Sequence, residues 1–212
     1  MFENMTPAHR AALDAIIGAR HTVREFSATP LGRADVEAII QAGLLAPFPA
    51  LAVAGKPDFR KVVVIPNPSP AMKTATDVIR KRMAKLADEL EQKLGLIPYV
   101  NVLKRAREQE GPIVGDAPYF VIVGERKGMP PAASESLSYC LENMWLKATS
   151  LKIGFRLISA TMQMGGDPDF CALLGIPCGE YALDGCALGY PAEGYEPAPV
   201  EYPMLARSVT WL

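Results

Sequence analysis

The sequence predicts an α+β or α/β protein in which a β-sheet is flanked by long helices. Three short runs of β-branched and other apolar residues lie far apart, and segments with helical apolar spacing separate them. Strands so far apart do not form hairpins, so the intervening helices must pack on the sheet. The 212 residues are 50% hydrophobic, enough for one sizeable core, and we expect residues 1–212 to form a single domain.

Capping signals and apolar spacing predict the helices. The first follows Thr6-Pro7, ends near Gly18 and turns three apolar residues inward: Leu13, Ile16 and Ile17. Further helices are predicted at 32–46, 70–94, 134–151 and, after an Asp167 cap and before a glycine stop, 168–174. The inward residues of the segment 70–94 are Met72, Val78, Ile79, Met83, Leu86 and Leu90.

Three strands are predicted, at 61–66, 117–126 and 180–191. The segment 153–160 is a short strand or a turn. The region around 95–115 reads as an insertion, which either covers the substrate side of a site or is a surface excursion.

Charge and composition argue against several classes of function. The net charge is −1, so nucleic acid and anionic membranes are not expected as main partners. Neither a transmembrane window nor a signal peptide is evident, which predicts a cytoplasmic protein. The four cysteines form no C-x-x-C pair, so we expect buried reduced thiols and no metal site.

Common catalytic motifs are absent from the sequence. It has no G-x-G-x-x-G after a strand, no P-loop, no G-x-S-x-G and no H-E-x-x-H, and its only histidines are His9 and His21. We therefore expect no catalytic side chain of these types.

The stretch "ARHTVREF" concentrates polar residues between the first two helices. Arg20, His21, Thr22 and Arg24 offer guanidinium forks, a ring donor and a hydroxyl, which suit a phosphate. The alternative is an ordinary basic helix end, where cations complement the helix dipole. Both interpretations remain open from composition alone.

The order of several motifs resembles the nitroreductase superfamily. "ARHTVREF" is similar to the family's N-terminal signature, and "LGRADVEAIIQAGLLAP" to the helix that follows it. "KVVVI" and "DAPYFVIVGE" match the first central strands, "ESLSYCLENMWLKATSLKIGFRLISA" the central helix and turn, and "LGIPCGEYALDGCALGYPAE" a late segment ending in G-Y-P.

The resemblance implies an α+β nitroreductase-like fold, with a central mixed sheet, long flanking helices and a C-terminal extension. It also implies a homodimer that binds FMN and uses NAD(P)H to reduce a nitroaromatic, quinone or related acceptor in a two-electron cycle. A flavin-binding protein with lost or altered reductase activity is the alternative.

Cofactor-binding residues follow from the same resemblance. Arg20 matches a phosphate-binding arginine and Arg24 a cation near the ribityl chain and pyrimidine of the flavin. The other matched positions are His21, Thr22, Ile158, Ser159 and Ala160, the last three supplying backbone N–H groups to the ring.

Two departures from the family pattern stand out. The loop after Ala46-Pro47 lacks the usual Ser, Asn and Gln, and no base follows Pro191 until Arg207, which is either a shifted phosphate clamp or a surface residue. The tail after Pro191 is apolar and proline-rich, so we expect it to embrace a partner subunit.

Overall fold

The computed structural model describes residues 4–49, 57–94, 100–101, 104, 110–197 and 209–210. In chain order its elements are α1 (Pro7–Ala19), α2 (Arg33–Leu44), β1 (Arg60–Pro66), α4 (Pro70–Leu94), β2 (Tyr119–Arg126), α6 (Ala133–Ser150), β3 (Gly154–Leu157), the 3₁₀ helix η1 (Ser159–Gln163), α7 (Pro168–Leu174) and β4 (Tyr181–Gly189). Each predicted helix and strand therefore has its counterpart, and the segment 153–160 divides into a strand and a turn.

The four strands form one sheet in the order β1-β2-β4-β3, and each neighbouring pair is antiparallel. The α+β class is confirmed. The resemblance implied a mixed sheet, but the parallel pairing that the structure describes is a single bridge between Thr22 and Phe155. The mixed character is confined to this bridge because, among the described residues, no further strand pairs with either edge of the sheet.

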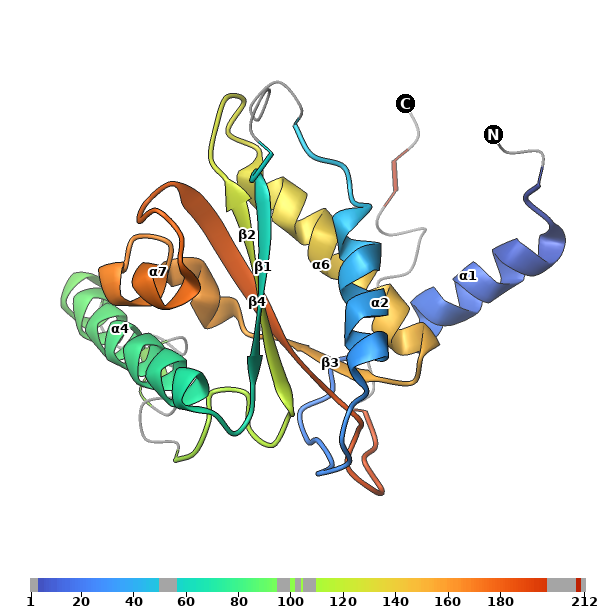
Figure 1. The fold of residues 1–212 in the computed structure, drawn as a ribbon, viewed down its shortest axis with the longest axis horizontal. Coiled ribbons are helices and arrows are strands. Elements are labelled where there is room, and N and C mark those ends of the chain that lie inside the picture. Colours follow the sequence, from blue (N-terminus) through green and yellow to red (C-terminus); the bar gives the residue numbers. More distant parts are fainter. Residues whose placement is uncertain are drawn as a thin grey trace.

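Helices cover both faces of the sheet (Figure 1). On β2, Phe120 and Ile122 belong to the hydrophobic cluster under α4 and α7, whereas Val121 and Val123 belong to the cluster under α2 and α6. Successive side chains of a strand point to opposite faces, so a strand buried on both sides is apolar throughout. This explains why "YFVIV" reads as a continuous hydrophobic run.

The long helix α4 confirms its predicted apolar face. Met72, Ile79 and Met83 are buried, and the other predicted inward residues, Val78, Leu86 and Leu90, are partly buried against the same cluster. Periodic spacing succeeds here because this face of α4 packs against α7, η1 and the sheet.

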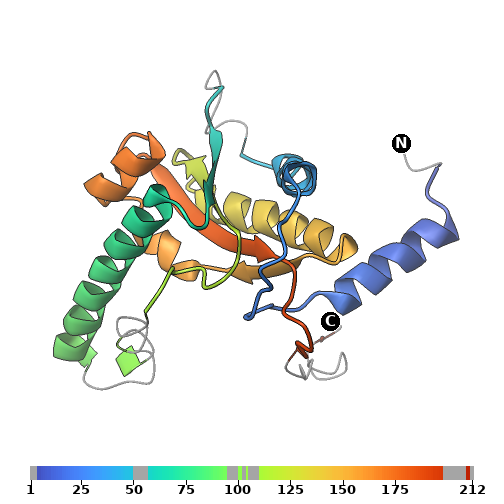
Figure 2. The ribbon, with the colours of Figure 1, turned by 60° about the horizontal axis from the view of Figure 1, so that its bottom comes forward.

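The predicted inward face of α1 is wrong for this chain. Thr6 caps the helix, with its hydroxyl accepting from the His9 backbone N–H, but no residue of α1 is buried. Leu13 and Ile17 are 52% and 49% exposed, and Figure 2 shows α1 projecting from the body of the molecule. Apolar spacing indicates a stripe on a helix but does not say what covers it.

The cysteine prediction needs one correction. Cys140, Cys171 and Cys186 are buried free thiols, but Cys178 is an exposed free thiol in the turn after α7. It is exposed because α7 ends at Gly175, which adopts a left-handed conformation (φ 63°), and the chain then turns at the surface before β4. Within the described residues, no helix combines the length and apolarity that a membrane span requires.

Candidate functional site

The basic segment of residues 20–24 lies against β3. The backbone N–H of Val23 donates to the carbonyl oxygen of Phe155 at 3.0 Å, next to the parallel bridge between Thr22 and Phe155. The hydroxyl of Tyr195 donates to the carbonyl of Thr22 at 2.7 Å. After this contact the chain reaches the segment that follows β4, where the N–H of Ser27 donates to the carbonyl of Tyr190 at 2.8 Å.

Arg20 is held on the side of α6. Its Nε lies 3.2 Å from Oε1 of Glu142, and its guanidinium stands 4.4 Å from the centre of the Trp145 ring. The side chain keeps 26% of its surface exposed, so donor groups remain open to solvent and to a ligand. The stacked ring fixes the orientation of the guanidinium plane.

His21 and Thr22 contribute through the backbone as well as the side chain. Nδ1 of His21 donates to the carbonyl of Ala19 at 2.8 Å, and because a carbonyl only accepts, Nδ1 carries the proton in this contact. The indole N–H of Trp145 donates to the carbonyl of His21 at 3.2 Å. These bonds hold the segment in an extended path, and the Thr22 side chain stays half-buried.

Arg156 of β3 is a charged residue that the sequence analysis missed. Its Nη2 donates to the carbonyl of Ile113 at 2.8 Å, while its buried Nε has no hydrogen-bond partner among the described residues. Burial and, second, the positive charge of Arg24 hold the pKa of Arg156 below its usual value. The signal that could have found it is an arginine inside the apolar run "IGFRLI".

The turn after β3 contains the other three predicted residues. The N–H of Ile158 donates to the carbonyl of Gly185 at 2.8 Å, which fixes the turn to β4. Ile158 is buried, Ala160 is half-buried and Ser159 is exposed. The first internal bond of η1 runs from Thr161 N–H to Ile158, so the N–H groups of Ser159 and Ala160 have no partner within the helix.

The loop after Ala46 is tied down by a buried ion pair that the sequence analysis also missed. Nε of Arg60 lies 2.7 Å from Oε2 of Glu125, and both side chains are almost fully buried. Arg60 also donates to the carbonyls of Ala46 and Pro47 at 3.2 and 3.3 Å. Ser136 donates to Glu125 at 2.9 Å. The two residues of the pair are distant in the sequence. The only local indication of it is a charged residue at the end of each apolar strand.

A separate polar cavity of about 310 Å³ lies between α6, η1 and β4. Its walls include Ser134, Gln163 and Asp184. Burial raises the pKa of Asp184 to about 6, and the N–H of Gly185, which donates to its Oδ1 at 2.7 Å, offsets part of that effect. This carboxylate is half-buried and has no cation within salt-bridge distance in the described part of the chain.

The structure therefore brings together seven of the eight predicted cofactor residues, along β3 and the turn that follows it. Arg207 lies outside the described residues. The late G-Y-P segment is adjacent, since Phe26 bridges Pro191 and the N–H of Ala192 donates to the carbonyl of Glu25. An anionic cofactor fits this donor set, because cations dominate it and a buried guanidinium N–H lacks an acceptor.

The fold and this site define an α+β protein with a basic segment bonded to an edge strand. The nitroreductase family model matches residues 17–190, which is most of the chain. The chain belongs to the nitroreductase family.

Solved structures share the fold. An FMN-bound nitroreductase from Bacteroides fragilis is 24% identical, with a TM-score of 0.72 and coverage of 94% of this chain and 98% of its own. A BluB-like flavoprotein from Clostridium difficile is 21% identical, with a TM-score of 0.68 and coverage of 94% and 98%. Iodotyrosine deiodinase bound to FMN and 3-iodo-L-tyrosine is 17% identical, with a TM-score of 0.66 and coverage of 94% and 100%. No curated protein sequence matches the chain.

Proposed function

We propose that this chain is an FMN-dependent oxidoreductase that takes electrons from NAD(P)H and reduces a nitroaromatic, quinone or related acceptor. The observation that carries the proposal is the basic segment of residues 20–24, which is bonded to the edge strand β3 in a member of the nitroreductase family. Structures that share its fold contain bound FMN. The basic segment and the family support the same cofactor.

Bound FMN would supply the redox chemistry, accepting a hydride from the nicotinamide and passing it to the acceptor. The chain binds and orients it. Arg20 and the Thr22 hydroxyl would hold the phosphate end, and Arg24 would lie nearer the ring. The N–H groups of Ser159 and Ala160 would donate to the ring, while Ile158 gives an apolar support.

The test is the absorbance spectrum of the purified protein. We expect a flavin spectrum, either as purified or after adding FMN, that bleaches when NADH or NADPH is added without oxygen. Protein that stays colourless and does not bind added FMN would contradict the proposal. The nicotinamide that bleaches faster identifies the donor.

A flavin-binding protein with altered activity is the second candidate. The loop after Pro47 lacks the polar residues usual in the family, and the carbonyls of Ala46 and Pro47 are already bound to Arg60. The fold also occurs in an iodotyrosine deiodinase, so it supports other acceptors. A flavin spectrum that neither nicotinamide bleaches would favour this candidate.

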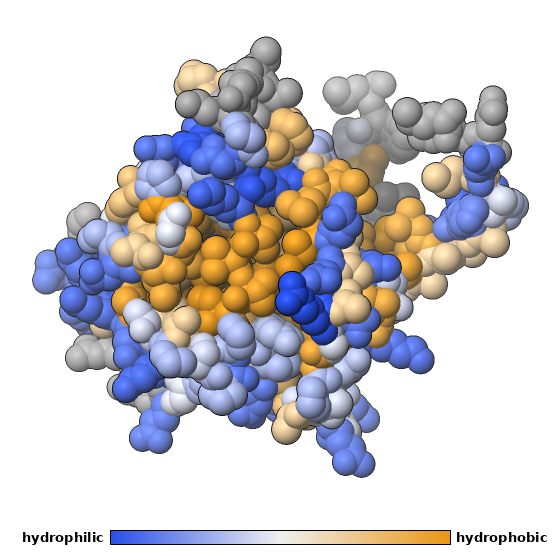
Figure 3. All heavy atoms as spheres, in the orientation of Figure 1, coloured by the Kyte–Doolittle hydropathy of each residue, from blue (hydrophilic) through white to orange (hydrophobic). Residues whose placement is uncertain are grey.

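We also propose that the protein is a homodimer. The exposed apolar residues Leu13 and Ile17 of α1 lack cover in one chain, and Figure 3 shows an apolar area where β1 forms an edge of the sheet (Figure 1). Large apolar patches on a single chain mark interaction surfaces. Light scattering should give twice the chain mass for the protein and for the control Arg10→Ala, and a smaller mass for Leu13→Glu. A monomeric protein would contradict the proposal.

A further inference from the structure

The polar cavity between α6, η1 and β4 has an unpaired carboxylate in its wall. Asp184 makes one hydrogen bond among the described residues, in which its Oδ1 accepts from the N–H of Gly185 at 2.7 Å. Oδ2 has no donor in that part of the chain, and no cation lies within salt-bridge distance there. A half-buried carboxylate has lost part of its hydration, so a donor supplied by a ligand would be favourable.

The sheet explains why this carboxylate faces a cavity. Leu183 belongs to the hydrophobic cluster under α4 and α7 and Cys186 to the cluster under α2 and α6, so the alternation of β4 directs Asp184 toward α6. The pairing of β3 with β4 ends at Leu157, opposite Cys186. Asp184 therefore lies beyond the paired part, where the chain leaves β3 for η1.

The rest of the wall offers further acceptors and an apolar surface. The hydroxyl of Ser138 donates to the carbonyl of Ser134 at 3.0 Å, so its oxygen can still accept from a ligand. Leu137 and Met162 supply apolar contacts. The volume of about 310 Å³ is at the lower end of the range for small-molecule sites.

The charges around Asp184 do not neutralise it. Lys127 also lines the cavity, but it is exposed and its ammonium donates to the carbonyl of Gly179 at 3.0 Å. Burial raises the pKa of the nearby Tyr181 and Cys186, so both are uncharged near neutral pH. The parts of α6 and η1 that line the described wall contribute no titratable group.

We propose that this cavity binds a small organic cation, an amine or amidine attached to an apolar ring or chain, which pairs with Asp184. Cationic donors form the stronger class of hydrogen bond with a carboxylate, and the apolar wall accepts the ring or chain. The site goes beyond the proposed function. It shares η1 with the proposed flavin contacts at Ser159 and Ala160, but it needs no flavin in order to bind its ligand.

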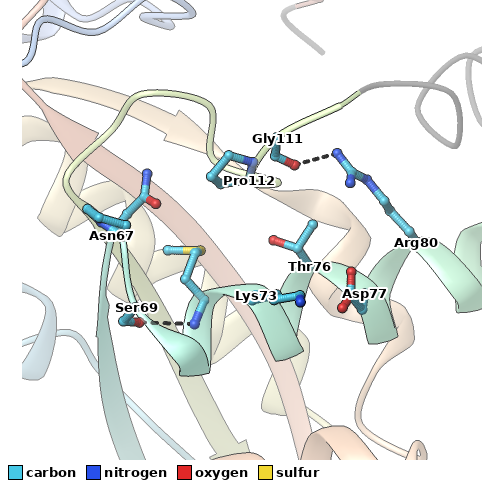
Figure 4. Close-up of a pocket in the computed structure, with 10 residues that line it drawn as sticks. Asn67, Ser69, Lys73, Thr76, Asp77, Arg80, Gly111 and Pro112 are labelled. Carbon is cyan, nitrogen blue, oxygen red and sulfur yellow. Dashed lines mark hydrogen bonds between the residues drawn. The ribbon is translucent and has the colours of Figure 1, made fainter.

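A second cleft of nearly the same volume provides a matched control. It lies between α4 and the segment 111–112, measures about 320 Å³ and has Asp77 in its wall (Figure 4). Lys73 and Arg80 line the same cleft, so its overall charge is positive. Asp77→Asn therefore removes a carboxylate from a cleft of similar size that should not bind the cation.

The experiment measures by calorimetric titration how tightly the purified protein binds benzamidine and benzamide, its uncharged isostere. We expect benzamidine to bind more tightly, and Asp184→Asn to weaken it about ten- to a hundred-fold. Asp77→Asn should leave its affinity unchanged. Gln163→Glu adds a negative charge to the same wall and should strengthen benzamidine binding about two- to five-fold, a gain that a poorly folded variant would not show.

The pH dependence gives a second readout on the unaltered protein. Because burial raises the pKa of Asp184 to about 6, the carboxylate is ionised at pH 7.5 and mostly protonated at pH 5. Benzamidine affinity should therefore fall about ten-fold between these two pH values, and in Asp184→Asn it should stay constant.

Several results would overturn the inference. One is a Kd for benzamidine above about 10 mM, or one no lower than that for benzamide. Another is an unchanged affinity in Asp184→Asn, or an equal loss in Asp77→Asn, which would mean that the cation binds elsewhere. A protein that binds benzamidine through Asp184 but does not bind FMN would contradict the proposed function and leave this inference standing.

Discussion

Two groups of arginines in this chain have opposite surroundings. Arg60 is 2% exposed at its side chain, and each of its three nitrogen atoms donates to at least one oxygen of the protein. Arg156 on β3 is half-buried and Arg24 beside it is exposed; neither pairs with a carboxylate in the described part of the chain, and Nε of Arg156 has no acceptor there. All three residues are arginines, and they differ in how many of their N–H groups find an acceptor in the protein.

The difference distinguishes a structural cation from a ligand-binding one. A buried guanidinium is tolerated when hydrogen bonds and an opposite charge replace its hydration, and Arg60 receives both. An incompletely satisfied guanidinium keeps binding capacity for something outside the chain. Arg60 therefore holds the loop at Ala46 and Pro47, and the cations beside β3 are available to a cofactor.

Breaking the satisfied pair should have the largest effect on stability. Glu125→Ala leaves the Arg60 charge buried without its partner, and we expect the free energy of unfolding to fall by about 3–5 kcal/mol. Urea unfolding measures it. The matched double variant Arg60→Met with Glu125→Leu should recover most of that loss, because neither charge is then buried. A loss below about 1 kcal/mol for Glu125→Ala would show that the pair is not desolvated as the structure indicates.

The sequence predicts the fold correctly for the elements that their neighbours cover and for those with clear capping signals. The Asp167 cap and the stop at Gly175 predicted α7 because a capping carboxylate and a left-handed glycine act locally. The exposure of Leu13 and Ile17 could not be predicted, since apolar spacing on α1 does not say what packs against the helix.

Only the part of the site that is contiguous in the sequence could be predicted. Residues 20–24 stand together in the sequence, so their polar character was visible. Arg156 and the Arg60–Glu125 pair depend on strands that meet in space: β1 and β2 place Arg60 opposite Glu125, and nothing in either strand specifies the register by itself. The only signal was a charge inside an apolar run for Arg156 and a charge at the end of an apolar run for each member of the pair.

Asp184 tests what burial does to a charge that lacks an opposite charge. Its pKa, raised by burial to about 6, means that the folded protein favours the neutral acid. Its contribution to stability is therefore fully present below about pH 4 and lost as pH rises through about 6.

Asp184→Asn keeps an oxygen that can accept from Gly185 and has no charge to bury. We expect it to exceed the unaltered protein in unfolding free energy by roughly 2–3 kcal/mol at pH 7 and by much less at pH 4. Urea unfolding between pH 4 and 8 measures both curves. A constant difference across that range would mean that Asp184 titrates normally.

Arg20 is intermediate between the two groups, because it has a carboxylate partner and remains partly exposed. We expect Arg20→Ala to weaken FMN binding by about 1.5–3 kcal/mol, or ten- to a hundred-fold, through loss of a charged phosphate contact. Glu142→Gln is the matched control: it removes the competing anion, so FMN affinity should stay equal or rise. Fluorescence titration gives both constants, and an unchanged affinity in Arg20→Ala would exclude it as the phosphate ligand.

Thiol labelling of Cys140 tests the Arg60–Glu125 pair, and the expected effect is smaller than the effect on unfolding. Burial is the main cause that raises the pKa of Cys140 to about 11, the Glu125 carboxylate adds to it, and the Arg60 guanidinium opposes it. In the native protein at pH 8 a thiol reagent should modify the exposed Cys178 rapidly and Cys140 slowly.

Glu125→Ala removes the carboxylate and leaves the guanidinium, so the pKa of Cys140 should fall and its labelling should accelerate, while Cys178 reacts as before. Cys178→Ser, combined with each background, isolates the slow thiol. Equal labelling rates for Cys140 in both backgrounds would mean that the charge of Glu125 does not act on the thiol. The buried network would then act through packing and hydrogen bonds alone.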